Sequence, residues 1–148
     1  MEIRGEHPYH SGEVLKVHAG GFEFETRGEF DVVDITRRVE RVVAESGVRA
    51  GMALVYAGHA TGVIALNENE AGLLEDLRDL LRELTPSDGE YHHHGNAHAH
   101  LRSMLLEPSK VLPVTGGRLG LGTWQSLLWV EAETRPRRRR VDVTVLGE

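Results

Sequence analysis

The strongest pattern of apolar and polar positions runs from residue 69 to residue 84. Its leucines recur at the three- and four-residue spacing that places side chains on one face of a helix, and Pro86 follows as a stop signal. These leucines are Leu73, Leu74, Leu77, Leu80, Leu81 and Leu84. The pattern predicts an amphipathic helix over residues 69–84.

Two shorter helices are predicted on either side of it. Apolar positions at helical spacing follow Asp34 and Thr36, either of which can cap a helix, and Gly47 offers a stop. Later in the chain, Asn96 can cap a helix that Pro108 ends. Each segment is long enough for two to three helical turns.

Strands are predicted where apolar residues alternate with polar ones or form short runs. Residues 14–18 and 22–26 flank Gly20-Gly21, a pair that readily takes the positive φ angles of a tight hairpin. The later runs are residues 52–56, 63–66, 110–115, 122–132 and 141–146, with a turn at Gly116-Gly117. The runs 52–56 and 63–66 suit two buried strands joined at a corner that carries His59. This mixed order of elements favours an α+β fold with a mainly antiparallel, sandwich-like sheet and two to three helices.

The composition narrows the class of protein. A chain of 148 residues with 40% hydrophobic and 27% charged residues predicts one globular domain over residues 1–148. The absence of cysteine excludes disulfides and thiolate ligands. The net charge of −6 and the lack of any apolar run near the ~18 residues of a membrane span argue against nucleic-acid and membrane partners. We expect a cytoplasmic protein.

Histidine is the residue type that points to chemistry. Five of the nine histidines lie between residues 92 and 100. His98 and His100 point about 200° apart on a helix, so one of them serves an inward-facing site, and His100 is the candidate. His59 lies between small residues at a strand end, where an imidazole can bind a metal or carry a proton. The competing interpretations are a hydrogen-bonded structural role for His59 and a solvated loop for residues 92–94.

Carboxylates accompany these histidines. Glu68 follows a predicted strand, and Asp76 lies near the leucine stripe. If His59, His93 and His100 converge with a carboxylate, they suit a divalent metal ion such as zinc, with magnesium as the alternative. The spacing itself matches no zinc-protease motif, phosphate loop or nucleophile elbow.

Several stretches, in the same order, resemble the YjbQ-like family. His59-Ala60-Thr61-Gly62, a strand and Asn67-Glu68 resemble the family's His-Thr-Thr/Ser-Ala and Asn-Glu motifs. The other matching segments are Asp76, Pro86, Tyr91-His92-His93, residues 95–101, Gly117-Arg118, Gly122-Thr123-Trp124-Gln125, Glu131, Arg139 and Gly147-Glu148. Two departures are Ala60, which lacks the usual hydroxyl, and a shorter loop before Asn96, which leaves open whether His93 or His94 occupies the family's position.

The resemblance implies an activity and a site. Some members are described as secondary thiamine-phosphate synthases, which join hydroxymethylpyrimidine diphosphate to a thiazole phosphate and release pyrophosphate. The implied catalytic residues are His59, His100, Glu68 and Asp76. The implied ligand-binding residues are Asn67, Asn96, Thr123, Trp124, Gln125, Arg118 and Arg139. The resemblance also implies a homotrimer that binds a small phosphorylated molecule.

Two placements follow from these assignments. Because alternate residues of a strand face opposite sides, Gln125 and Glu131 are expected on one face, in the site, and Trp124 on the other. Arg139 is expected to reach the histidine pocket of a neighbouring chain, where it would bind an anion.

Two other functions fit the same residues. One is a metal-dependent hydrolase or phosphotransfer enzyme that activates water at the histidine and carboxylate cluster. The other is a non-catalytic oligomer that binds a metal or an anion. Metal content, phosphatase screening and turnover on a broad substrate panel separate these alternatives.

Overall fold

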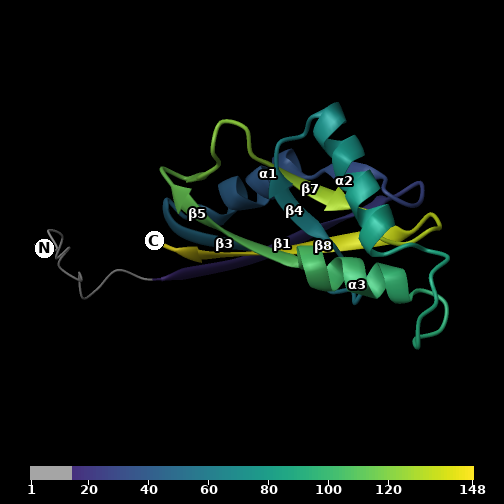
Figure 1. Cartoon of the computed structure of the whole chain (residues 1–148). Helices are drawn as coiled ribbons and strands as arrows, with labels where there is room; N and C mark the ends of the chain where they lie inside the picture. The colour runs from purple at the N-terminus through teal and green to yellow at the C-terminus, as the bar shows by residue number, and fades with distance from the viewer. Residues whose placement is uncertain (1–14) are drawn as a thin grey trace, which may run out of the picture.

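The computed structural model describes residues 15–148, which form three helices and eight strands (Figure 1). The helices are α1 (Thr36–Ser46), α2 (Ala71–Leu84) and α3 (Ala97–Leu106). The strands are β1 (Lys16–Glu25), β2 (Val32–Asp34), β3 (Ala50–Tyr56), β4 (Ile64–Asn67), β5 (Ser109–Thr115), β6 (Arg118–Leu119), β7 (Ser126–Val130) and β8 (Arg138–Gly147). Each of the three predicted helices is present.

The strands form two antiparallel sheets. One has five strands in the order β1-β8-β3-β5-β6, and the other has three in the order β2-β7-β4. Every strand pair in both sheets is antiparallel. The predicted α+β class with a mainly antiparallel sheet is therefore confirmed.

The main core lies between the five-stranded sheet, helix α1 and the three-stranded sheet (Figure 1). The rings of Phe24 on β1 and Trp129 on β7 meet edge to face, with centroids 5.4 Å apart. Val39 and Val43 supply the buried side of α1. Alternate residues of β3, β5 and β8 point into this core, as expected for a sheet with one covered face.

The predicted hairpin at Gly20-Gly21 is wrong, because both glycines lie inside the continuous strand β1, which pairs along its length with β8. A Cβ atom at Gly20 would lie 2.8 Å from Cγ1 of Val42 on α1, and one at Gly21 would lie 2.9 Å from the carbonyl oxygen of Val141. The glycines thus serve close packing rather than a turn. Val14, the first residue of the predicted strand 14–18, lies outside the described residues.

Strand β3 is only half buried, so the prediction of two buried strands is wrong for this one. Val17, Met52, Leu54, Tyr56 and Val111 lie exposed on the face of the five-stranded sheet opposite the core. Among residues 15–148, no helix combines the length and apolar character needed to cross a membrane.

Candidate functional site

The corner between β3 and β4 positions His59, which is partly exposed. The amide of Gly62 donates to the carbonyl oxygen of His59 at 3.0 Å and closes the turn. A Cβ atom at Gly62 would lie 2.7 Å from that of Ala57, so glycine is needed for this close approach. The hydroxyl of Ser103 on α3 donates to the carbonyl oxygen of Gly62 at 2.5 Å. The corner is therefore fixed to α3.

A buried ion pair between Arg139 and Glu131 holds the corner that carries His59. The guanidinium of Arg139 on β8 donates to both carboxylate oxygens of Glu131, which follows β7. Its third nitrogen donates to the hydroxyl of Thr61 at 3.2 Å. The hydroxyl of Thr26 donates to Glu131 at 2.8 Å. Thr61 lies two residues after His59, so this network holds the histidine corner against the ends of β7 and β8.

These charges act on His59. Burial lowers the pKa of its imidazole below the ordinary value of 6.5, the positive charges of Arg139 and Arg137 lower it further, and Glu131 opposes them. His59 is therefore neutral at pH 7. A neutral imidazole can accept a proton or bind a cation.

A second hydrogen-bonded chain begins at Asn96. This residue occupies the cap position of α3, but its side chain makes no capping hydrogen bond. Instead, its amide nitrogen donates to Glu133 at 2.9 Å, and its amide oxygen lies 3.2 Å from Nε2 of His93. Arg137 donates to the same Glu133 oxygen at 3.2 Å. The side chain of Asn96 thus bonds within a polar cluster formed by His93, Asn96, Glu133 and Arg137 instead of capping α3.

Glu133 is ionised in this cluster. Burial raises the pKa of its carboxyl group, but the hydrogen bond from Asn96 and the charges of Arg137, Arg139 and Arg135 lower it by more, so that the pKa falls below its ordinary value of 4.5. The carboxylate is nine-tenths buried and joins the loop after β7 to the start of α3. Both Arg137 and Arg139 act on His59 as well as on Glu133, so the two networks are adjacent.

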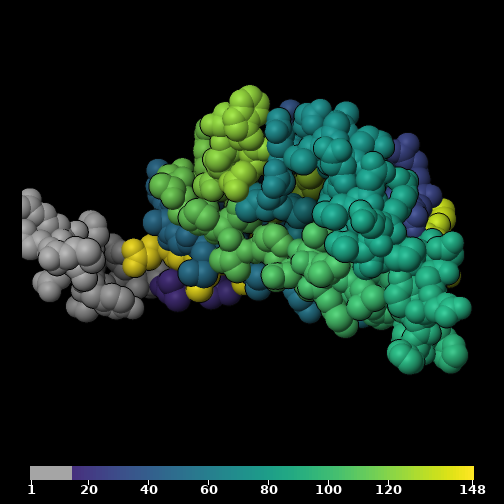
Figure 2. Space-filling model, in the orientation of Figure 1, coloured from purple at the N-terminus to yellow at the C-terminus, as the bar shows by residue number. Residues whose placement is uncertain are grey.

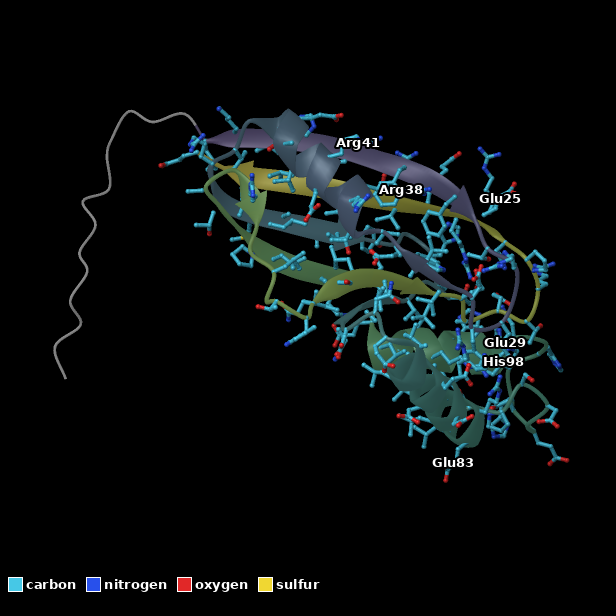
Figure 3. The ribbon with its side chains drawn as sticks, turned by 90° about the horizontal axis from the view of Figure 1, so that it is seen from above. Glu25, Glu29, Arg38, Arg41, Glu83 and His98 are labelled. Carbon is cyan, nitrogen blue, oxygen red and sulfur yellow. The ribbon has the colours of Figure 1, made fainter. Side chains whose placement is uncertain are left out.

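The histidine cluster divides as the helical geometry requires. The rings of His93 and His100 lie 4.7 Å apart, edge to face. His98 is buried, the charges of Arg102 and Glu29 act on its ring, and Figure 3 shows it next to Glu29. His92, His93 and His94 are all exposed, as the solvated-loop interpretation of residues 92–94 expects. The structure therefore places His93 rather than His94 beside His100 and Asn96.

The other predicted site residues lie elsewhere in the chain. Asn67 and Glu68 lie at the far end of β4, where Asn67 pairs with Ser126 on β7. Thr123, Trp124 and Gln125 form an exposed turn before β7, in which the side chain of Gln125 accepts from the amide of Gly122. Asp76 is exposed on α2, and Arg118 is exposed on β6.

The expectation that Gln125 and Glu131 share one site is wrong. They flank β7 at opposite ends, and the six residue-to-residue steps between them, at about 3.4 Å each, separate them by roughly 20 Å. The expectation that Arg139 reaches a neighbouring chain is also wrong, since its guanidinium is fully buried against Glu131. The exposed basic group beside it is Arg137, whose side chain is about a quarter exposed.

The sequence interpretation missed Thr61, Ser103, Glu133 and Arg137 as members of the cluster. A signal for two of them exists in retrospect: Glu131 and Glu133 precede a short turn, and Arg137 and Arg139 follow it at the same two-residue spacing. Within residues 15–148, no three histidine or carboxylate side chains are arranged to hold one metal ion. The zinc or magnesium site at His59, His93 and His100 is therefore not formed by the described part of a single chain.

A family model described as UPF0047 protein YjbQ-like matches residues 21–148. The chain belongs to this YjbQ-like family. A UPF0047 protein of Methanothermobacter thermautotrophicus is 38% identical over 93% of this chain and 97% of its own length. One from Archaeoglobus fulgidus is 44% identical over 82% of this chain and 95% of its own length.

Solved structures agree with the assignment to the YjbQ-like family. A YbjQ-like protein of unknown function from Sulfolobus solfataricus has a TM-score of 0.87 and 37% identity, over 91% of this chain and all of that one. A hypothetical protein from Aeropyrum pernix has a TM-score of 0.83 and 41% identity, over 88% of this chain and 98% of that one. Neither of these names states an activity.

Proposed function

We propose that this YjbQ-like protein is a cytoplasmic enzyme that binds a small phosphorylated molecule beside His59. The observation that carries the proposal is the electrostatic environment of His59, where two guanidinium groups act on a neutral imidazole. The resemblance to secondary thiamine-phosphate synthases supplies the specific reaction. That reaction joins hydroxymethylpyrimidine diphosphate to a thiazole phosphate and releases pyrophosphate.

The two arginines have different roles in this proposal. Arg139 is enclosed by Glu131 and Thr61, so it positions the corner and adds to the positive field. Arg137 pairs with one oxygen of Glu133 and remains partly exposed. It is the group that can turn to a phosphate, because a guanidinium makes strong charge-assisted hydrogen bonds to phosphate oxygens.

The remaining chemistry belongs to histidine. Departure of pyrophosphate needs stabilisation of negative charge, to which Arg137 contributes directly. In the joining step the thiazole nitrogen bonds to the methylene carbon while the carbon–oxygen bond to pyrophosphate breaks, and no proton is released. His59, neutral at pH 7, donates a hydrogen bond to the departing pyrophosphate. His93, which contacts Asn96, and His100 beside it are proposed to contact the rest of the substrate.

We propose a homotrimer as the working assembly. The exposed apolar face that contains Met52, Leu54 and Val111 is larger than scattered surface residues explain, and self-association covers such a face. A cyclic assembly also gives Asn67, Glu68 and the 123–125 turn a route to the histidine cluster of another copy. A zinc or magnesium ion at His59, His93 and His100 would need a further ligand from a second copy in this assembly.

The test is product formation from hydroxymethylpyrimidine diphosphate and thiazole phosphate, followed through pyrophosphate release. We expect His59→Gln and Arg137→Met to lower kcat/KM at least tenfold. Arg138→Met is the matched control, because Arg138 is exposed and pairs with Glu23 on β1. No product from the wild type, or equal rates for Arg137→Met and Arg138→Met, would contradict the proposal. Phosphate release from single substrates that depends on added metal would favour the hydrolase instead.

A further inference from the structure

A separate cleft of about 270 Å³ lies between α2, β4 and the end of α3. Its walls are aliphatic and include Leu66 of β4, Leu74 and Leu77 of α2, and Leu106 of α3. The space-filling view shows the surface hollowed beside α2 (Figure 2). The volume lies just below the roughly 300–1,000 Å³ of pockets for drug-sized ligands, so the cleft suits a smaller molecule.

Lys110 is the one cation among the described residues that line this cleft. Its ammonium donates to the carbonyl oxygens of Leu106 at 3.0 Å and Ser109 at 3.2 Å. An ammonium carries three protons, so one hydrogen bond remains for another acceptor. Burial lowers the pKa of Lys110 below its ordinary value, while Glu107 raises it. An anionic partner would offset this cost of burial.

Asn67 and Glu68, at the polar rim of the cleft, limit the charge of the anion that can bind there. Glu68 lines the same cleft, and its amide donates to the side chain of Asn67 at 2.8 Å. Phosphate dianions are generally held by several donors, whereas Lys110 has one to offer. The carboxylate of Glu68 would repel a doubly charged group more strongly than a singly charged one. A singly charged acceptor with an aliphatic body matches both the wall and the rim.

We propose that this cleft binds a small aliphatic carboxylate, with its chain against the leucines and its carboxylate on the ammonium of Lys110. The site goes beyond the proposed phosphate chemistry, because the residues that line the cleft do not include His59 or Arg137. Asn67 and Glu68 border this cleft and are also proposed to approach the histidine cluster of another copy, whereas Lys110 belongs to the cleft alone. Lys110→Met is therefore expected to leave pyrophosphate release unchanged.

The sequence offers a matched control for this site. Lys16 and Lys110 are the only two lysines of the chain, and Lys16 is exposed at the start of β1. Octanoate is the probe, titrated into the full chain by calorimetry and compared with octylamine and octyl phosphate. We expect octanoate to bind best, Lys110→Met to weaken it at least tenfold, and Lys16→Met to leave it unchanged. Leu73→Trp, at a half-exposed wall position, is expected to block the cleft without unfolding the protein.

A second measurement does not depend on variants. Trinitrobenzenesulfonate modifies lysine amines, and peptide mass analysis then distinguishes Lys16 from Lys110. Octanoate is expected to protect Lys110 alone. The proposal is overturned if octanoate at millimolar concentration does not bind. It is also overturned if octylamine or octyl phosphate binds as tightly as octanoate, or if Lys110→Met binds octanoate as tightly as the wild type.

Discussion

Arg139 and Glu131 form a bidentate ion pair in which neither side chain is exposed to solvent. Such a pair stabilises only while both partners are present, because a single buried charge keeps its desolvation cost and loses its compensation. The same pair holds Thr61 and thereby the corner that carries His59.

Removing one member of this pair is therefore expected to destabilise the protein strongly. Glu131→Gln should lower the free energy of unfolding by about 3–5 kcal/mol, measured by urea denaturation. The double variant Glu131→Leu, Arg139→Met should recover most of that loss, since apolar replacement of a whole buried pair is often neutral. A double variant as unstable as the single one would show that the pair itself supplies net stability.

His98 predicts a pH dependence of stability. Its ring is buried, neither ring nitrogen has a hydrogen-bond partner in the described structure, and burial followed by the charge of Arg102 lowers its pKa below 6.5, against opposing effects of Glu29 and Glu133. Between its lowered pKa in the folded protein and 6.5, His98 is therefore protonated in the unfolded chain but neutral in the folded one. Stability is complete above pH 6.5 and falls as the pH drops towards the folded pKa.

The measurement is the free energy of unfolding at a series of pH values from 7.5 to about 5, where unperturbed histidine titrates. His98→Leu should reduce the slope, because leucine fills the site without a proton to bind. His92→Gln, at an exposed position, should leave the slope unchanged. A slope that His98→Leu does not alter would assign the pH dependence to another group.

The helices were predictable because their signals are local. The leucine stripe of α2 and the αL glycine at the end of α1, Gly47 with φ 69°, need only neighbouring residues to be recognised. The paired strands required more, because Gly20 packs on Val42 of α1, twenty-two residues away. A glycine pair has the same local signature in a turn and in a close contact, so the sequence could not separate the two.

The candidate site was predictable only in part for the same reason. Histidines attract attention by their chemistry, so His59, His93 and His100 were identified. Glu133 is one of 23 acidic residues, and what distinguishes it from a solvated carboxylate is its burial and its contact with Asn96, 37 positions away. Gln125 was misplaced because β7 begins at Ser126, four residues later than the apolar run indicated.

The packing of Gly20 gives a direct test of its structural role. Gly20→Val improves strand propensity but places a β-branched side chain against Val42, where even a Cβ atom is at 2.8 Å. Overpacking of this kind is expected to cost about 1–3 kcal/mol of unfolding free energy, measured by urea denaturation. Ala19→Val is the matched control on the open face of the same strand and should show no such loss. Equal stability of the two variants would mean that α1 moves away at little cost.

The exposed face of the five-stranded sheet is predicted to form the interface of the proposed homotrimer. Leu54 on β3 and Val111 on β5 are register partners, and Val111 is 61% exposed. Sedimentation analysis at micromolar concentration is expected to show a trimer for the wild type. Val111→Asp should shift it to monomer, because an unpaired carboxylate would be buried in the interface. Met104→Asp, on α3 and 74% exposed, is the control expected to remain trimeric. A wild-type monomer would refute the assembly, whereas a trimer that survives Val111→Asp but not Met104→Asp would move the interface from the sheet to α3.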